Sequence, residues 1–196
     1  MNFENAPIQE QENKQRAFEA LFESILRNQG KDIPTIEYHF PYPKEEFLKF
    51  LTENKNVLLH GSANQNLEVL EPRQANDAAK KSGNKNAVYG VTDPVLPIFY
   101  AIQDRKKLEG VIESGINIDG ETGKSEYKLR IPKSAQETQS WTNGVIYIFD
   151  KNQFRPEQND NGEASGEWTS DVPLKPIAKL EVKPEDFKYM DKIEYN

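Results

Sequence analysis

A histidine followed by two small residues stands directly after a short apolar run from Val57 to Leu59. The run predicts a buried strand that presents His60 at its end, with Gly61 and Ser62 behind it. Such a motif brings an imidazole and free backbone amides together beside a cleft, and glycine lets a flat ligand approach the main chain closely. Taken alone, the same three residues are more typical of a turn than of a site.

Two tyrosines lie in a second segment, in which a predicted strand is followed by a predicted helix. Tyr89 ends another short apolar run, which predicts a strand, and Tyr100 falls within the short helix predicted after it. Thr92 or Asp93 can cap this helix, and Pro94 suits its first turn. Without further context the segment is a strand, a cap and a helix, and its aromatic residues would be core residues.

A carboxylate next to a large aromatic residue forms the third candidate element, Glu167-Trp168. A partly enclosed acid can hydrogen-bond a sugar hydroxyl or stabilise a developing positive charge. Glu157 and Glu163 lie nearby and compete for the same role. For Trp168, as for Trp141, packing is the favoured interpretation, although its position beside Glu167 leaves a direct role in substrate binding open.

The elements that must position these residues change in character along the chain. Helices are predicted first and strands dominate later, an order that favours an α+β fold over alternating βαβ units. The predicted helices cover 1–30, with Gly30 as a stop, 43 to 54–56, and 93 or 94 to 103; the predicted strands cover 57–59, 87–89, 126–131, 144–149, 167–170 and 176–182.

The second half of the chain contains the clearest strand signal. Residues 144–149 are almost continuously apolar, which predicts a central strand. Residues 154–166 are polar and predict a solvated loop near the substrate. They lack the regular acidic spacing of a calcium-binding loop. Phe187 and Tyr189 are expected to fix the C-terminal tail.

Composition excludes several classes of function. The net charge is −7 and the basic residues do not cluster, which argues against general nucleic-acid binding. The chain has no cysteine, so disulfides, thiolate metal sites and cysteine nucleophiles are excluded. His39 is expected to be structural, and no metal is expected. The segment from Met1 to Gln15 lacks the apolar core of a signal peptide, and no apolar run would span a membrane, so we expect a cytoplasmic protein.

Taken together, the three elements resemble the His-Tyr-Glu pattern of ADP-ribosyltransferases of the diphtheria-toxin and poly(ADP-ribose) polymerase type. The resemblance covers residues 57–182 and rests on the runs LLHGSANQNLEVLEPR, AVYGVTDPVLPIFYAI and EWTSDVPLKPIAKLEV. It implies a split mixed β-sandwich within a single domain. The catalytic core would comprise residues 57–196, with an N-terminal helical region, 1–56, packed on it.

The resemblance also implies roles for individual residues. His60 would donate a hydrogen bond to the adenosine-side ribose of NAD, and the Gly61 backbone, with Ser62 beside it, would bind the nicotinamide carboxamide. Tyr89 and Tyr100 would sandwich the nicotinamide ring. Two further residues complete the implied site: Glu167 would stabilise the oxocarbenium-like transition state as nicotinamide leaves, and Arg73 would reach a phosphate.

The implied activity is transfer of ADP-ribose from NAD, the substrate, to a macromolecular acceptor, expected to be a protein, or hydrolysis of NAD. Pro97 occupies the place of a serine that holds the carboxamide in the family. A non-catalytic module that binds NAD, ADP-ribose or a peptide on the same fold is therefore the main alternative. A related transferase acting on an RNA 2′-phosphate is disfavoured, because it needs basic residues around the phosphate.

Overall fold

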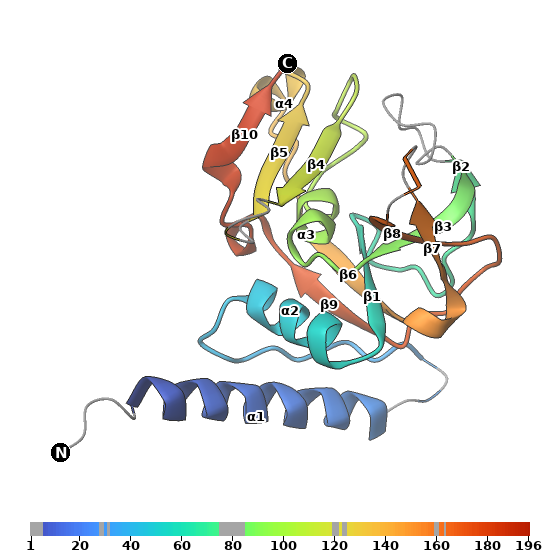
Figure 1. Cartoon of the computed structure of the whole chain (residues 1–196). Coiled ribbons are helices and arrows are strands. Elements are labelled where there is room, and N and C mark those ends of the chain that lie inside the picture. The colour runs from blue at the N-terminus through green and yellow to red at the C-terminus, as the bar shows by residue number, and fades with distance from the viewer. Residues whose placement is uncertain are drawn as a thin grey trace.

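The computed structural model describes residues 6–27, 30, 32–74, 85–118, 122, 125–158, 161–162 and 164–196 of the chain, and their arrangement is an α+β fold (Figure 1). The helices are α1 (Ala6–Arg27), α2 (Lys44–Asn54), α3 (Val95–Ala101) and α4 (Ser134–Glu137), with the short 3-10 turns η2 (Lys151–Gln153), η3 (Pro184–Asp186) and η4 (Met190–Lys192). The strands are β1 (Val57–Ser62), β2 (Arg73–Gln74), β3 (Asn86–Val91), β4 (Glu113–Ile118), β5 (Ser125–Ile131), β6 (Gly144–Asp150), β7 (Arg155–Gln158), β8 (Ala164–Ser170), β9 (Ala178–Val182) and β10 (Ile193–Tyr195).

The larger sheet follows the order β7-β8-β3-β1-β6-β9, with β2 paired separately to β3. Neighbouring strands on this path are antiparallel. β6 lies between β1 and β9, and all of its residues except Asp150 are buried. The prediction of a central strand at 144–149 is therefore confirmed.

The smaller sheet has the order β10-β5-β4. β5 confirms the strand predicted at 126–131 and pairs antiparallel with β4, whereas β10 joins its other side in parallel. The predicted strands include neither β4 nor β10. In β4 the apolar pattern is interrupted by Ser114, Gly115 and Asn117, so the sequence predicts no strand there. β10 has only three residues, and its pairing with the distant strand β5 makes it a strand.

Alternate residues of β1 belong to two apolar clusters on opposite faces of the larger sheet, because successive side chains of a strand point to opposite faces. Val57 and Leu59 belong to the larger cluster, which includes Phe18 of α1. Leu58 belongs to the second cluster, with Phe149 of β6. Phe18 is 1% exposed, and burying a side chain of this size contributes about 1.5–3 kcal/mol. Residues before and after position 56 thus share one core.

Two glycines allow α3 to lie directly against the sheet. A Cβ atom added to Gly61 of β1 would come within 1.9 Å of the carbonyl oxygen of Pro97. A Cβ atom added to Gly144 of β6 would come within 2.0 Å of the carbonyl oxygen of Ala101. Gly61, predicted to make room for a ligand, therefore makes room for the backbone of α3.

Asp93 caps α3, as the sequence predicts. Its Oδ1 accepts hydrogen bonds from the backbone N–H groups of Val95 and Leu96, at 3.0 and 2.8 Å. Its Oδ2 accepts one from the Tyr127 hydroxyl at 2.8 Å, which ties the start of the helix to the smaller sheet. Pro97 is the third residue of the helix, where an N–H group would have no partner within the helix, so the proline fits without breaking it.

α1 is described as far as Arg27, and the two residues before the predicted stop at Gly30 lie outside the described residues. Other predicted boundaries need correction. β1 continues through Ser62, so His60 lies inside a strand and not at its end. The predicted loop 154–166 contains β7 and the start of β8, because β7 pairs antiparallel with β8 even though few residues of this segment are apolar.

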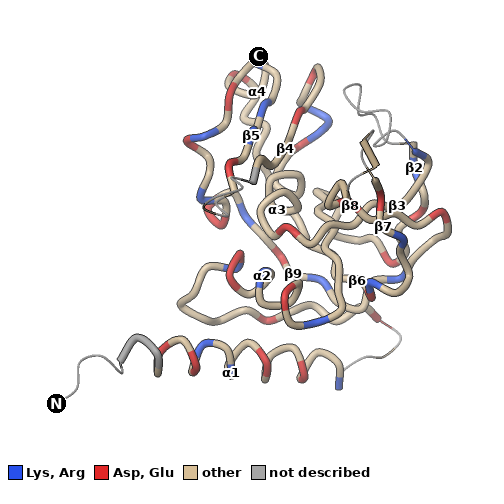
Figure 2. The backbone as a smooth tube through the Cα atoms, viewed as in Figure 1, with Lys and Arg blue, Asp and Glu red and all other residues tan. Residues whose placement is uncertain are grey.

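Charged residues of both signs are interspersed along the described backbone (Figure 2). Several link the N-terminal helices to their surroundings: Lys14 of α1 contacts Glu46 of α2 at 2.7 Å, and Lys44 contacts Asp186 at 2.9 Å. Within the described ranges, no helix combines the length and the apolar composition needed to cross a bilayer.

Candidate functional site

His60 joins two strands at the point where their backbone pairing stops. In the described residues, β1 and β3 form a registered pair at Leu59 and Val91. One residue further along β1, the Nδ1–H group of His60 donates a hydrogen bond to the backbone carbonyl of Tyr89 at 2.8 Å. The His60 side chain thus takes the place of the next backbone hydrogen bond between β1 and β3. Because a carbonyl can only accept, this bond places a proton on Nδ1, and in the neutral ring Nε2 then carries no proton.

The surroundings of His60 favour its neutral form. Burial lowers the pKa of the imidazole below its ordinary value of 6.5, and the positive charge of Arg73 lowers it further, while the hydrogen bond to Tyr89 acts in the opposite direction. A neutral ring with its proton on Nδ1 presents Nε2 as a hydrogen-bond acceptor.

Arg73 is one of the charges that lower the pKa of His60. It is exposed on β2, opposite Ala87 of β3. Ser62 is engaged locally, since its hydroxyl accepts a hydrogen bond from the backbone of Asn64 at 3.1 Å.

Tyr89 and Glu167 share one face of the larger sheet. In the antiparallel pairing of β3 with β8, Tyr89 lies opposite Thr169 and Val91 lies opposite Glu167. Residues two apart on a strand project to the same face, so these four side chains lie on one side. Burial raises the pKa of the Tyr89 phenol, and the negative charges of Glu167 and Glu157 add to the rise.

A bulge between β7 and β8 sets the start of the strand that carries Glu167. The pairing shifts register between Pro156 and Gln158, and Gly166 adopts a φ of 79°, which glycine accepts without strain. The Ser165 hydroxyl donates to the carbonyl of Glu157 at 3.1 Å and accepts from the backbone N–H of Glu167 at 3.2 Å. Bulges of this kind redirect side chains.

The two acids of this region have different surroundings. Glu157, predicted to lie on a solvated loop, is 6% exposed on β7, and its carboxylate accepts hydrogen bonds from Lys85 and from the Thr169 hydroxyl. Burial alone would raise its pKa, but these two hydrogen bonds bring the pKa below its ordinary value. Glu167 is partly exposed on β8. Glu163, the third candidate acid, lies outside the described residues.

Tyr100 is held by contacts from a different part of the chain. Its hydroxyl lies 2.6 Å from the Ser114 hydroxyl of β4, and the Arg105 guanidinium lies over its ring, 5.3 Å from the centroid. These contacts fix the ring at the junction of α3 and the smaller sheet. Neither Ser114 nor Arg105 was a candidate from the sequence, because no local pattern connects them to Tyr100.

Trp168 lies on the other face from Glu167. It is opposite Gly90 in the pairing of β8 with β3 and packs against the cluster that contains Leu58. Lys151 lies over its indole ring, 4.2 Å from the centroid. The interpretation of Trp168 as a packing residue therefore holds, and its place next to Glu167 in the sequence does not bring the two side chains together.

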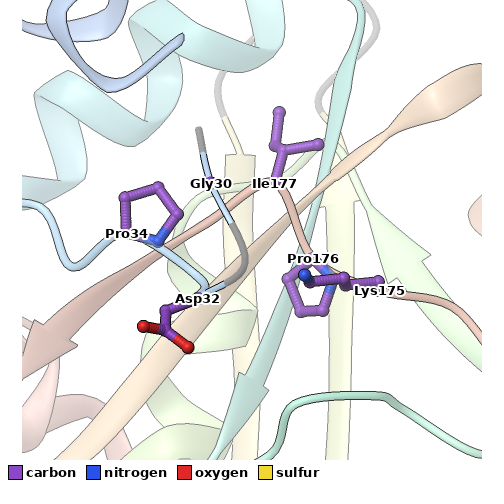
Figure 3. Close-up of a pocket in the computed structure, with 6 residues that line it drawn as sticks. All are labelled: Gly30, Asp32, Pro34, Lys175, Pro176 and Ile177. Atoms are coloured by element: carbon purple, nitrogen blue, oxygen red, sulfur yellow. The ribbon is translucent and has the colours of Figure 1, made fainter. Parts of the chain in front are cut away.

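The pocket in Figure 3 lies between the segment after α1 and the segment before β9. It has a volume of about 200 Å³ and is lined by Gly30, Asp32, Pro34, Lys175, Pro176 and Ile177. Other surface pockets lie between α1 and α2 and beside Trp141 and Tyr195. These three are lined by residues other than the candidates. Among the described residues, no group of three histidine or acidic side chains is arranged to hold a metal ion.

Comparison with known proteins gives no match: no family model, no curated protein and no solved structure is significantly similar to this chain. The functional argument therefore depends on the side chains themselves and on the sequence motifs that carry them.

Proposed function

We propose that His60, Tyr89 and Glu167 form an NAD site at which ADP-ribose is transferred to a macromolecular acceptor, expected to be a protein, or to water. The observation that carries the proposal is their placement on three adjacent strands, β1, β3 and β8. Tyr89 and Glu167 share one face of the sheet, and His60, which points to the other face, contacts Tyr89 where the backbone pairing of β1 with β3 stops. The three residues also interact: His60 donates to the carbonyl of Tyr89, and the charge of Glu167 acts on the phenol of Tyr89. The proposed fold is the split mixed β-sandwich of the ADP-ribosyltransferase type, a specific form of the α+β arrangement described above.

In the proposed reaction, the bond between the nicotinamide nitrogen and the ribose carbon breaks. Nicotinamide leaves with the electron pair, and the ribose acquires oxocarbenium character. The carboxylate of Glu167 binds the ribose hydroxyl and stabilises the positive charge. A nucleophile of the acceptor, or water, then forms the new bond to the same carbon and loses a proton.

The tautomer of His60 reverses the expected direction of its hydrogen bond with the ribose hydroxyl of NAD. Because Nδ1–H is already donated to Tyr89 and the pKa is lowered, Nε2 is an acceptor at neutral pH. The ribose hydroxyl would therefore donate to His60, and not accept from it. Arg73, which is exposed on β2, suits a phosphate through its planar guanidinium.

The two tyrosines would position the nicotinamide ring. Tyr89 offers a partly exposed ring on the same sheet face as Glu167. Arg105 lies over the ring of Tyr100, so a stacked ligand would use the opposite face of that ring. Aromatic pairs favour offset stacking or edge-to-face contact, and both suit a flat pyridinium amide.

Titration calorimetry with NAD tests the binding step. Wild type and His39→Ala should bind saturably, because the His39 side chain is 83% exposed, whereas His60→Ala should lose binding. The absence of wild-type binding at millimolar NAD, in a protein shown to be folded, would reject the proposal.

Nicotinamide release tests the chemical step. Glu167→Gln should retain NAD binding and lose about 10²–10³-fold in turnover, the usual effect of removing one group that stabilises charge in the transition state. Glu181→Gln, at an exposed position on β9, serves as the control. Tight binding with no release by the wild type in the presence of protein acceptors would instead identify a non-catalytic binding module.

A further inference from the structure

One buried carboxylate near the proposed site is used by neither the binding scheme nor the reaction. Glu157 is 6% exposed, and its two oxygens have separate partners. Oε1 accepts a hydrogen bond from Thr169, which is fully buried, and Oε2 accepts one from Lys85. Burying a carboxylate is costly unless its oxygens are satisfied, so this arrangement requires both partners.

The lysine that binds Glu157 also contacts Tyr89 through its main chain. The backbone N–H of Lys85 donates a hydrogen bond to the Tyr89 hydroxyl at 2.9 Å, and the same hydroxyl is 3.4 Å from the carbonyl of Lys85. The Lys85 side chain is fixed by a buried partner, whereas its backbone holds the end of the tyrosine ring.

The pairing of β3 with β8 closes this set of contacts. Thr169, which donates to Glu157, lies directly opposite Tyr89. The ring of Tyr89 is therefore fixed at its Cβ end by the strand and at its hydroxyl by Lys85, and Glu157 supports both attachments. The contacts join β7, β8, β3 and the residue that precedes β3.

We propose that Glu157 is a positioning residue that acts through Lys85 to fix the ring of Tyr89 for stacking against the ligand. The identity of that ligand as the nicotinamide end of NAD rests on the function proposed above. Glu157 does not touch the ligand, because Lys85 and Thr169 occupy its carboxylate.

The test uses Glu157→Gln, which keeps the size of the side chain and an acceptor for Thr169 but removes the charge that binds Lys85. Lys85→Met removes the same ion pair from the other side, and Lys85→Arg restores a cation. The control is Glu45→Gln, which breaks the Lys188–Glu45 pair at 2.9 Å. The side chains of that pair are 58% and 15% exposed, against 48% and 6% for Lys85 and Glu157, so the two pairs are of similar kind.

The first readout needs no ligand. Hydrogen exchange at the Lys85 amide, and the ring signals of ¹³C-labelled Tyr89 assigned with Tyr89→Phe, report whether the ring is held. Glu157→Gln and Lys85→Met should accelerate exchange about tenfold and shift the Tyr89 signals, as expected for loss of a hydrogen bond to a charged group. Lys85→Arg and Glu45→Gln should leave both unchanged. Wild-type exchange and signals in a folded Glu157→Gln would overturn the proposal.

The second readout is NAD affinity measured on the same proteins. Glu157→Gln and Lys85→Met should weaken binding about tenfold, with the loss appearing in KM more than in kcat, and Lys85→Arg should recover it. Normal affinity in Glu157→Gln, despite a displaced ring, would overturn the positioning role. If wild type binds no NAD, the proposed function fails while the ligand-free readout still decides whether Glu157 holds Tyr89. If Glu157→Gln does not fold, Lys85→Met, changed at a half-exposed position, gives the same decision.

Discussion

His60 and Tyr89 are joined by a hydrogen bond of 2.8 Å that takes the place of backbone pairing between β1 and β3. The bond fixes the tautomer of the imidazole and the spacing of two strands at once. It also makes His60 a group whose protonation affects both folding and the proposed binding.

The first prediction concerns the pH dependence of His60. Burial, with a contribution from Arg73, lowers its folded pKa below the ordinary value of 6.5, which the unfolded chain retains. As pH falls below 6.5 the unfolded chain takes up the proton first, so the stability from this group is complete above 6.5 and decreases towards the folded pKa. Imidazole NMR titration should therefore place His60 below 6.5.

Removing the charge of Arg73 tests whether this charge contributes to the lowered pKa of His60. Arg73→Gln should raise the pKa of His60, because one of the two effects that lower it is gone. An unchanged titration in Arg73→Gln would show that Arg73 does not act on this histidine. NAD affinity should also weaken as pH falls through the measured pKa, since a protonated Nε2 cannot accept from a ribose hydroxyl.

The second prediction concerns the contact between Gly61 and α3. A Cβ atom at position 61 would lie 1.9 Å from the carbonyl oxygen of Pro97, and backbone cannot rotate away as a side chain can. Gly61→Ala should destabilise the protein by about 1–3 kcal/mol or more. In Gly115→Ala the new Cβ has no neighbour within 4 Å, so urea unfolding should show a change near zero. Equal unfolding midpoints for the two variants would contradict the close packing of α3 on β1.

A third prediction concerns the hydroxyl pair of Tyr100 and Ser114, which are 2.6 Å apart. A double-mutant cycle of Tyr100→Phe and Ser114→Ala should give a coupling energy of about 0.5–1.5 kcal/mol, the usual net value of one hydrogen bond. Thermal or urea unfolding of the four proteins measures it. Strictly additive effects would mean that the two hydroxyls do not interact in solution.

The fourth prediction separates the two faces of β8. Trp168→Phe should lower stability by about 0.5–2 kcal/mol, because the Lys151 contact and part of the packing are lost. It should leave nicotinamide release at saturating NAD unchanged, since Trp168 projects away from Glu167. A loss of turnover comparable to that of Glu167→Gln would place the indole in the site after all.

The sequence by itself determined the elements whose signals are local. Continuous apolarity predicted β6, a cap at Thr92 or Asp93 with Pro94 predicted the start of α3, and helical spacing predicted α1. It also singled out His60, Tyr89 and Glu167 as candidates. The predictions of elements are confirmed because each depends on neighbours within a few residues along the chain, whereas the roles of the candidate residues stay predictions.

Tertiary structure alone decided which side chains meet. The register of β3 with β8 placed Glu167 on the face of Tyr89 and turned Trp168 away, and a shift of one residue would exchange those faces. It also buried Glu157 against Lys85, 72 residues away in the chain. Strand faces and long-range ion pairs depend on partners distant in sequence, and no local pattern records them.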